Sequence, residues 1–133
     1  MSFTFGKGPS RQDATYARVP RGINGKLPLI EALRRALNFP EYCGSNWDSL
    51  EECVRDLSWL PAGTVVVVHE DLPLHDNPAA LHTYLSILRD AMGKWQAGSD
   101  RQLVVVFPTD ARNLVTDALA HLTGSSTSED KSP

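Results

Sequence analysis

The sequence is poor in cysteine and contains no long hydrophobic run. Two cysteines among 133 residues, Cys43 and Cys53, exclude a disulfide-rich scaffold, and neither of them needs a partner. No apolar stretch approaches the roughly 20 residues that a membrane span requires. The segment from Met1 to Ser10 also lacks the apolar core of a secretory leader. These absences predict a reduced, cytoplasmic protein that does not associate with membranes.

Patterns that mark metals, cofactors or catalysis are also missing. One short segment holds several potential metal ligands, namely His69, Glu70, Asp71, His75 and Asp76. It contains no histidine pair at i, i+4, and the cysteines do not have zinc spacing, so we interpret it as a polar loop after a strand. No glycine pattern of a phosphate-binding loop and no nucleophile beside a base is present. We therefore expect no metal, no cofactor and no enzymatic activity.

Charge is distributed unevenly, although the net charge is only −3. Seven basic and two acidic residues lie between Met1 and Arg35, whereas the stretch from Ala36 to Asp76 holds eight acidic residues and one basic residue. A middle third of this kind attracts a basic partner and repels nucleic acid. The alternative is an ordinary solvated face.

Hydrophobic periodicity predicts alternating strands and helices. Strands are expected at 14–19, 64–68 and 103–107, and helices at 28–38, 47–58, from 77 or 78 to 93–98, and 110–122. Short apolar strands separated by helices indicate an α/β domain, with a small three-stranded parallel sheet packed with helices and an additional C-terminal helix.

This domain is expected to span residues 14–122, between a flexible N-terminal arm at 1–13 and a disordered tail at 123–133. The C-terminal helix either packs on the sheet edge or forms a dimer contact. The sequence does not choose between these alternatives, and we expect a monomer.

The predicted helix that begins at Trp47 separates apolar from acidic residues. An arc of about 120° holds the residues expected to pack on the sheet, Trp47, Leu50, Cys53, Val54 and Leu57. Cys53 should therefore be an inert core thiol. Asp48 and Glu52 are spaced i, i+4 on the opposite side, where like charges cost a few tenths of a kcal/mol in an isolated helix. That cost is compatible with a binding role, but solvated helices also tolerate it.

The loop before this helix contains Tyr42 between Glu41 and a glycine, Gly44, that permits a tight turn. A tyrosine beside carboxylates is a good interface pair, because it offers a flat ring together with anions. The alternative is a half-buried ring with its hydroxyl in water, which we favour slightly from the residues alone. Ser45 or Asn46 can cap the helix, and Cys43 is expected to be accessible.

The stretch from Leu37 to Pro61 resembles the signature region of the barstar family, intracellular inhibitors of barnase-type ribonucleases. The pattern P-E-Y-x-G-x-N-x-D-x-L is matched by Pro40, Glu41, Tyr42, Gly44, Asn46, Asp48 and Leu50. The likeness extends roughly from Tyr16 to Phe107 and leaves out the N-terminal arm and the helix after Pro108. It implies the barstar-like α/β fold described above.

The resemblance also implies a function, the blocking of a basic ribonuclease active site by an acidic loop–helix surface. The implied partner-binding residues are Tyr42, Gly44, Asn46, Asp48, Glu51, Glu52 and Asp90. Tyr42 is expected against the catalytic histidine of the enzyme, and Asp48 beside a basic side chain. Glu52 falls at the position of the family's dominant acid, and Asp90 at a further acid on the last long helix.

Three positions depart from the family pattern. Glu52 replaces an aspartate, and Glu51 and Leu57 each replace a tryptophan. The implied partner is therefore a basic ribonuclease or toxin protein, and not necessarily barnase itself. The alternative is a barstar-like adaptor or regulator that binds a different basic protein.

Overall fold

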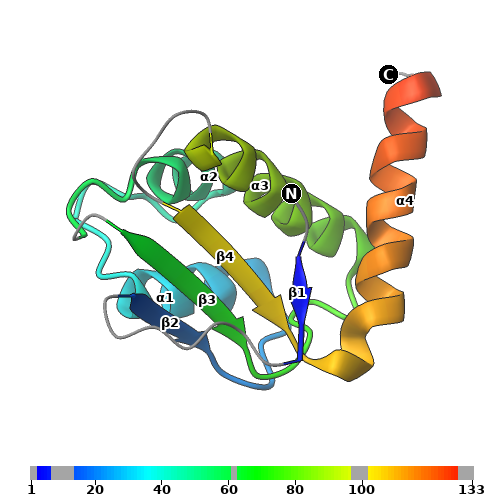
Figure 1. Ribbon diagram of the computed structural model, residues 1–133, viewed down its shortest axis with the longest axis horizontal. Coiled ribbons are helices and arrows are strands. Elements are labelled where there is room, and N and C mark those ends of the chain that lie inside the picture. Colours follow the sequence, from blue (N-terminus) through cyan, green and yellow to red (C-terminus); the bar gives the residue numbers. More distant parts are fainter. Residues whose placement is uncertain (1–2, 7–13, 61–62, 97–101, 129–133) are drawn as a thin grey trace.

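The computed structural model describes residues 3–6, 14–60, 63–96 and 102–128. Four parallel strands form one sheet in the order β1-β4-β3-β2 (Figure 1). The strands are β1 (Thr4–Phe5), β2 (Thr15–Val19), β3 (Thr64–His69) and β4 (Gln102–Phe107). The helices are α1 (Lys26–Ala36), α2 (Trp47–Asp56), α3 (Pro78–Gln96) and α4 (Arg112–Ser128), with a short 3-10 helix, η1 (Thr109–Ala111), before the last. The predicted α/β class is confirmed.

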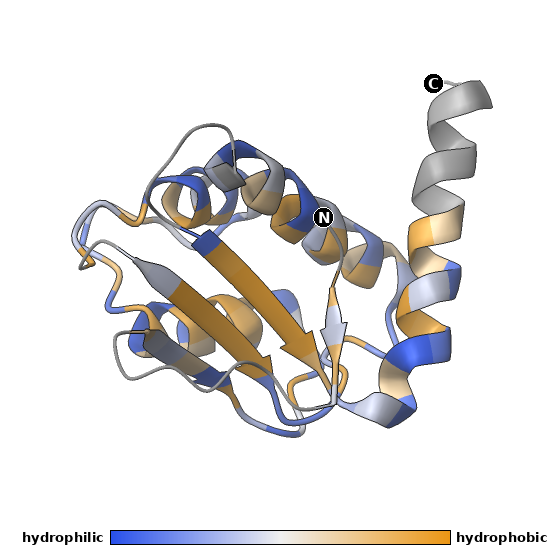
Figure 2. Cartoon of the chain, viewed as in Figure 1, coloured by the Kyte–Doolittle hydropathy of each residue, from blue (hydrophilic) through white to orange (hydrophobic). Residues whose placement is uncertain are grey.

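The two central strands, β3 and β4, are the apolar runs of the sequence and are coloured as the hydrophobic centre of the sheet in Figure 2. Ala17, Val67 and Val105 lie in register across β2, β3 and β4, and all three belong to the main core. Val66 is buried on the opposite face, because successive strand side chains alternate. The prediction that the valine run is buried on both faces is therefore correct.

Three helices supply the other half of this core. The apolar stripes of α1, α2 and α3 are buried as their spacing predicts, for example at Leu33, Leu50 and Leu88. Trp95 near the end of α3 donates its indole N–H to the carbonyl of Arg55 near the end of α2, at 3.1 Å. The helix that carries the acidic residues thus buries its apolar side in the main core and packs beside α3.

The sheet has four strands instead of the three expected, because β1 lies within the predicted N-terminal arm. Thr4 pairs with Val106, and Gly6 donates its backbone N–H to the carbonyl of Phe107 at 2.9 Å. The edge of the Phe3 ring meets the Phe107 ring at 5.5 Å. A two-residue strand is too short to produce a hydrophobic period, and it therefore cannot be predicted from the residues alone. The rest of the predicted arm, 1–2 and 7–13, lies outside the described residues.

Helix α4 continues to Ser128 and so includes the first part of the predicted tail. The serine-rich end has low helix propensity but contains no proline to stop a helix already formed. Residues 129–133 lie outside the described part. At the other end, Val115 and Ala118 are buried, and the Arg112 guanidinium lies 4.8 Å from the centre of the Phe5 ring. Of the two roles left open for this helix, packing within the molecule is the one supported, because α4 lies against α3 and contacts β1 through Arg112.

Candidate functional site

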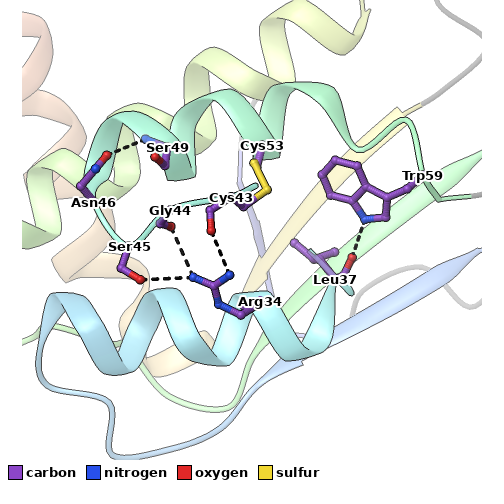
Figure 3. The surroundings of a disulfide bond; sticks show 9 residues. All are labelled: Arg34, Leu37, Cys43, Gly44, Ser45, Asn46, Ser49, Cys53 and Trp59. Carbon is purple, nitrogen blue, oxygen red and sulfur yellow. Dashed lines mark hydrogen bonds between the residues drawn. A yellow bond between two sulfur atoms is a disulfide. The ribbon is translucent and has the colours of Figure 1, made fainter. Parts of the chain in front are cut away.

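Helix α2 begins at the residue that its sequence specifies. Asn46 has an extended backbone, and its side-chain oxygen accepts a hydrogen bond from the backbone N–H of Ser49 at 2.8 Å (Figure 3). This confirms Asn46 as the cap. Its carboxamide oxygen is therefore bonded to the helix, although the residue as a whole is exposed.

The two sides of α2 separate as the helical spacing predicts. Leu50 and Val54 are buried, whereas Asp48 and Glu52 are exposed. Glu51 is half-buried and contributes to a groove of about 330 Å³ between α2 and α3. The groove is lined by Trp47, Asp48, Glu51, His82, Thr83, Ser86 and Ile87. The acidic side of α2 is thus an open face that borders a shallow groove.

Tyr42 is 71% exposed, so the half-buried alternative favoured from the residues alone is wrong. Its ring meets the Trp59 ring edge to face at 6.4 Å, and Trp59 meets Phe39 in the same way at 5.8 Å. The Trp59 indole N–H donates to the carbonyl of Leu37 at 2.9 Å. Sequence reasoning missed Trp59, because it lies beyond the helix in a segment without periodicity.

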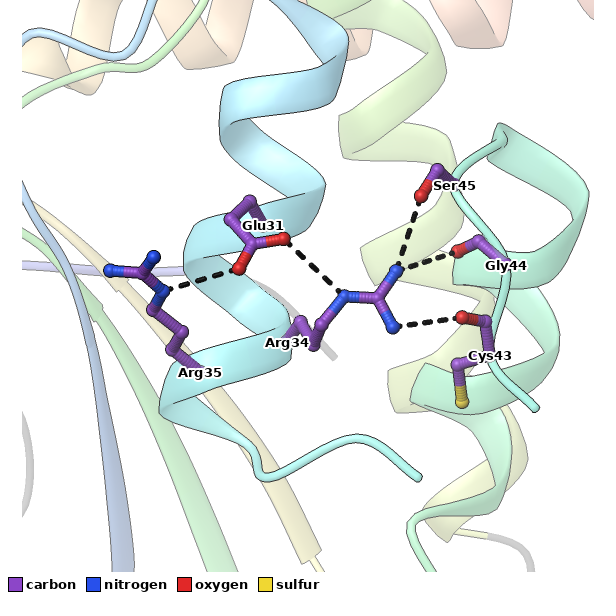
Figure 4. A network of polar contacts seen from close by, with 6 residues as sticks. All are labelled: Glu31, Arg34, Arg35, Cys43, Gly44 and Ser45. Atoms are coloured by element: carbon purple, nitrogen blue, oxygen red, sulfur yellow. Dashed lines mark hydrogen bonds and ion pairs between the residues drawn. The ribbon is translucent and has the colours of Figure 1, made fainter. Parts of the chain in front are cut away.

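Arg34 of α1 points toward the loop before α2 and is bonded to it (Figure 4). Its guanidinium donates to the carbonyl of Cys43 at 2.9 Å, to the carbonyl of Gly44 at 3.4 Å and to the hydroxyl of Ser45 at 3.2 Å. Glu31 lies 3.5 Å from the same guanidinium and balances its charge. The sequence shows only a basic residue near the end of a helix, so it gives no sign of this clamp.

Cys43 and Cys53 form a disulfide, which contradicts the expectation that both remain unpaired (Figure 3). Cys53 lies on the apolar side of α2, as its spacing predicts. The loop folds back over the start of α2 and turns Cys43 inward, so the two residues are only 3% and 4% exposed. The expectation of an accessible Cys43 is wrong for the same reason.

Gly44 lies close to the first turn of α2. A Cβ atom at this position would lie 2.8 Å from the hydroxyl oxygen of Ser49, so the Ser49 side chain would have to shift to admit it. Gly44 does not have a positive φ, so the tight turn expected at this glycine is not observed.

Asp90 is exposed on α3, with one carboxylate oxygen 4.0 Å from the Arg89 guanidinium. The structure gathers the other six predicted residues into one region, here called the loop–helix surface and defined as Tyr42, Gly44, Asn46, Asp48, Glu51 and Glu52. Asp90 lies on the helix that packs beside this surface, and not within it.

The segment with potential metal ligands, residues 69–76, begins with a buried histidine. His69 is buried in β3, and one ring nitrogen lies 2.9 Å from the carbonyl of Val106, which can only accept a hydrogen bond. The other ring nitrogen therefore accepts from the Tyr84 hydroxyl at 2.7 Å. Burial lowers the pKa of His69 to about 4, against smaller opposing effects of the Val106 hydrogen bond and of Asp71.

The described residues contain neither a cluster of metal ligands nor a helix suited to span a membrane. No group of three or more histidine, cysteine, aspartate or glutamate side chains in them is arranged to hold a metal ion. Within the same residues, no helix combines the length and the apolar composition needed to cross a membrane.

Comparison with known proteins agrees with this architecture. No curated protein matches the chain. A family model described as Barstar (barnase inhibitor) matches residues 20–108, from the end of β2 to the end of β4. The match covers well over half of the sequence and includes the whole loop–helix surface. The chain therefore belongs to the barstar family.

Proposed function

We propose that this protein inhibits a barnase-type ribonuclease by placing its loop–helix surface over the basic active site of the enzyme. The observation that carries the proposal is the joint exposure of Tyr42, Asp48 and Glu52 on a segment that lies within the family match. Gly44, Asn46 and Glu51 complete this surface, and Asp90 on α3 extends it.

Physical complementarity supports the proposal. Exposed carboxylates attract the basic side chains that an RNA-cleaving enzyme uses to bind phosphates, and they accelerate association over long distances. Tyr42 adds an aromatic ring that packs edge to face with the Trp59 ring. Because the ring rests on another aromatic side chain, it loses little conformational freedom when a partner covers it.

The same surface leads us to propose a protein partner in place of a substrate, a nucleic acid or a membrane. Asp48 and Glu52 lie on the exposed face of a helix, where a reacting group would not be shielded from water. Their negative charge repels RNA.

We propose that the protein acts in the cytoplasm, as a monomer and without a cofactor. Disulfides that occur in the cytosol are usually transient or redox-sensing, so this location implies that the Cys43–Cys53 bond is open to reduction there.

The test is inhibition of RNA cleavage by a barnase-type ribonuclease at stoichiometric excess of this protein. We expect cleavage to stop, and a double variant, Asp48→Asn with Glu52→Gln, to restore it. Asp117→Asn on α4 is the matched control, because it removes one exposed carboxylate far along the chain from the loop–helix surface. Undiminished cleavage across a panel of such enzymes would reject the proposal.

The departures at Glu51, Glu52 and Leu57 support a second candidate, an adaptor that uses this fold to bind a different basic protein. Leu57 is fully buried, so this departure lies in the core, and the departures on the surface itself are Glu51 and Glu52. Ribonuclease inhibition separates the two candidates, because an adaptor binds its basic partner without blocking RNA cleavage. Association that is insensitive to salt would point away from a basic active site, because steered association slows as ionic strength rises.

A further inference from the structure

We propose that the Cys43–Cys53 disulfide is a redox-controlled restraint on the loop–helix surface. The oxidised protein holds Tyr42 in its binding position, and reduction releases Tyr42 and weakens binding of the protein partner. This inference rests on the proposed function for its effect on binding, and on the structure alone for its effect on the loop.

The bond joins the two parts of the surface directly. Cys43 follows Tyr42 in the loop, and Cys53 follows Glu52 on α2. Their Cα atoms are 6.4 Å apart, across ten positions of the sequence. The bond therefore ties the residue beside the exposed aromatic ring to the residue beside the exposed acid. Breaking the bond between the sulfur atoms therefore frees the residues that directly follow Tyr42 and Glu52 in the chain.

The loop has few other attachments on the side of Tyr42. The described contact of the Tyr42 ring is with Trp59, and the Cys43 backbone N–H donates to the carbonyl of Pro40 at 3.1 Å. Arg34 holds the following residues through the carbonyls of Cys43 and Gly44. Reduction therefore leaves Gly44 and Ser45 attached to α1, and it loosens mainly the segment that carries Tyr42.

The chemical step is a thiol–disulfide exchange with a dithiol reductant. One reductant thiolate attacks a cysteine sulfur, and the other cysteine leaves as a thiolate that takes up a proton. The second thiol of the reductant then displaces the remaining cysteine. The reductant gives up two electrons and two protons and becomes a cyclic disulfide, while the protein gains two thiols. Because both sulfur-bearing residues are buried, attack requires the loop to open first.

An ordered loop binds more tightly than a loose one, because binding then costs less conformational entropy. Releasing a tyrosine and its neighbouring backbone is expected to weaken binding about ten-fold, mainly through faster dissociation. The effect should be absent from a protein that lacks both sulfur atoms.

The experiment compares oxidised protein, protein reduced with dithiothreitol, and the double variant Cys43→Ser with Cys53→Ser. Amide hydrogen exchange is measured at residues 41–43 and in α3, and inhibition of a barnase-type ribonuclease is measured in parallel. We expect faster exchange in the loop but not in α3, and about ten-fold weaker inhibition, both in the reduced protein and in the double variant. Adding dithiothreitol to the double variant should change nothing further.

The two readouts distinguish the possible failures. Unchanged loop exchange after complete reduction overturns the inference, whatever the inhibition assay shows. Faster exchange with equal inhibition by the oxidised and reduced forms overturns redox control of binding and leaves the proposed function intact. If no form inhibits, the proposed function is lost, and the exchange data still decide whether the bond restrains the loop.

Discussion

At the scale of single residues, position separates Glu52 from the other exposed acids. It shares a helix face with Asp48, and its neighbour Cys53 is bonded to the Tyr42 loop. We predict that Glu52→Gln weakens inhibition by about ten- to a hundred-fold, because charged contacts at interface centres contribute about 1–3 kcal/mol. Inhibition constants measured at two salt concentrations test this. Asp117→Asn should leave them unchanged, and an equal loss in both variants would show that general charge, and not Glu52, is responsible.

Arg34 and Arg35 are adjacent but have different surroundings. The Arg34 side chain is 25% exposed and bonded to the loop, whereas that of Arg35 is 81% exposed and paired only with Glu31 among its described contacts. We predict that Arg34→Met lowers the free energy of unfolding by about 2 kcal/mol, because the loop carbonyls lose a charged donor. Arg35→Met should have no measurable effect. Urea denaturation of both variants provides the comparison, and equal stabilities would contradict the clamp.

These two arginines also show what sequence can and cannot reveal about the site. The acidic face of α2 and the capping role of Asn46 follow from spacing, because each depends on residues within a few positions of one another. The Arg34 clamp, the Trp59 support and the disulfide all depend on how the loop folds back over α1 and α2. Such contacts leave no local pattern, and the sequence therefore predicted the face of the site but not its supports.

At the scale of elements, α4 is anchored by one side of its first turns. Val115 is fully buried and Leu114 is 54% exposed, although the two are consecutive. We predict that Val115→Ala lowers the free energy of unfolding by about 2 kcal/mol, through lost apolar burial and a residual cavity. Leu114→Ala removes more atoms but should cost much less. Thermal unfolding of the two variants decides whether α4 belongs to the folded unit, and a neutral Val115→Ala would show that it does not.

The elements that sequence predicted best are the long and strongly periodic ones. The buried faces of α2 and α3 and the valine strands β3 and β4 follow from apolar spacing alone. Strand β1 was missed because its two residues carry no period and gain their place only by pairing with β4. The last turns of α4 were missed because a helix can extend beyond its apolar stripe. Boundaries and edge elements therefore depended on tertiary context that no local pattern contains.

At the scale of the whole molecule, His69 connects three elements of the interior. From β3 it donates to the carbonyl of Val106 in β4 and accepts from the Tyr84 hydroxyl of α3, and its ring stacks on Phe107 at 4.2 Å. Both ring nitrogens are used in the neutral form, with the proton on the nitrogen that faces Val106. Protonation of the second nitrogen would remove its acceptor, so the charged form fits this interior poorly.

This arrangement predicts that the stability of the fold falls in mild acid. Burial lowers the pKa of His69 from 6.5 to about 4 in the folded protein. Between these values the unfolded chain binds a proton that the folded chain does not, so the free energy of unfolding decreases as pH falls, by about 1.4 kcal/mol per pH unit. The loss begins below pH 6.5 and amounts to about 2 kcal/mol by pH 5, above the range where most carboxylates titrate.

Urea denaturation between pH 7.5 and 5 measures this slope, in about half-unit steps. His69→Gln can keep a donor and an acceptor but cannot take up the proton, so its lower stability should vary much less over this range. His75→Gln is the matched control, because His75 is exposed and its variant should retain the slope of the parent protein. A parent protein whose stability is flat from pH 7.5 to 5 would mean that His69 can be protonated in place, and that the hydrogen bonds joining β3, β4 and α3 rearrange at little cost.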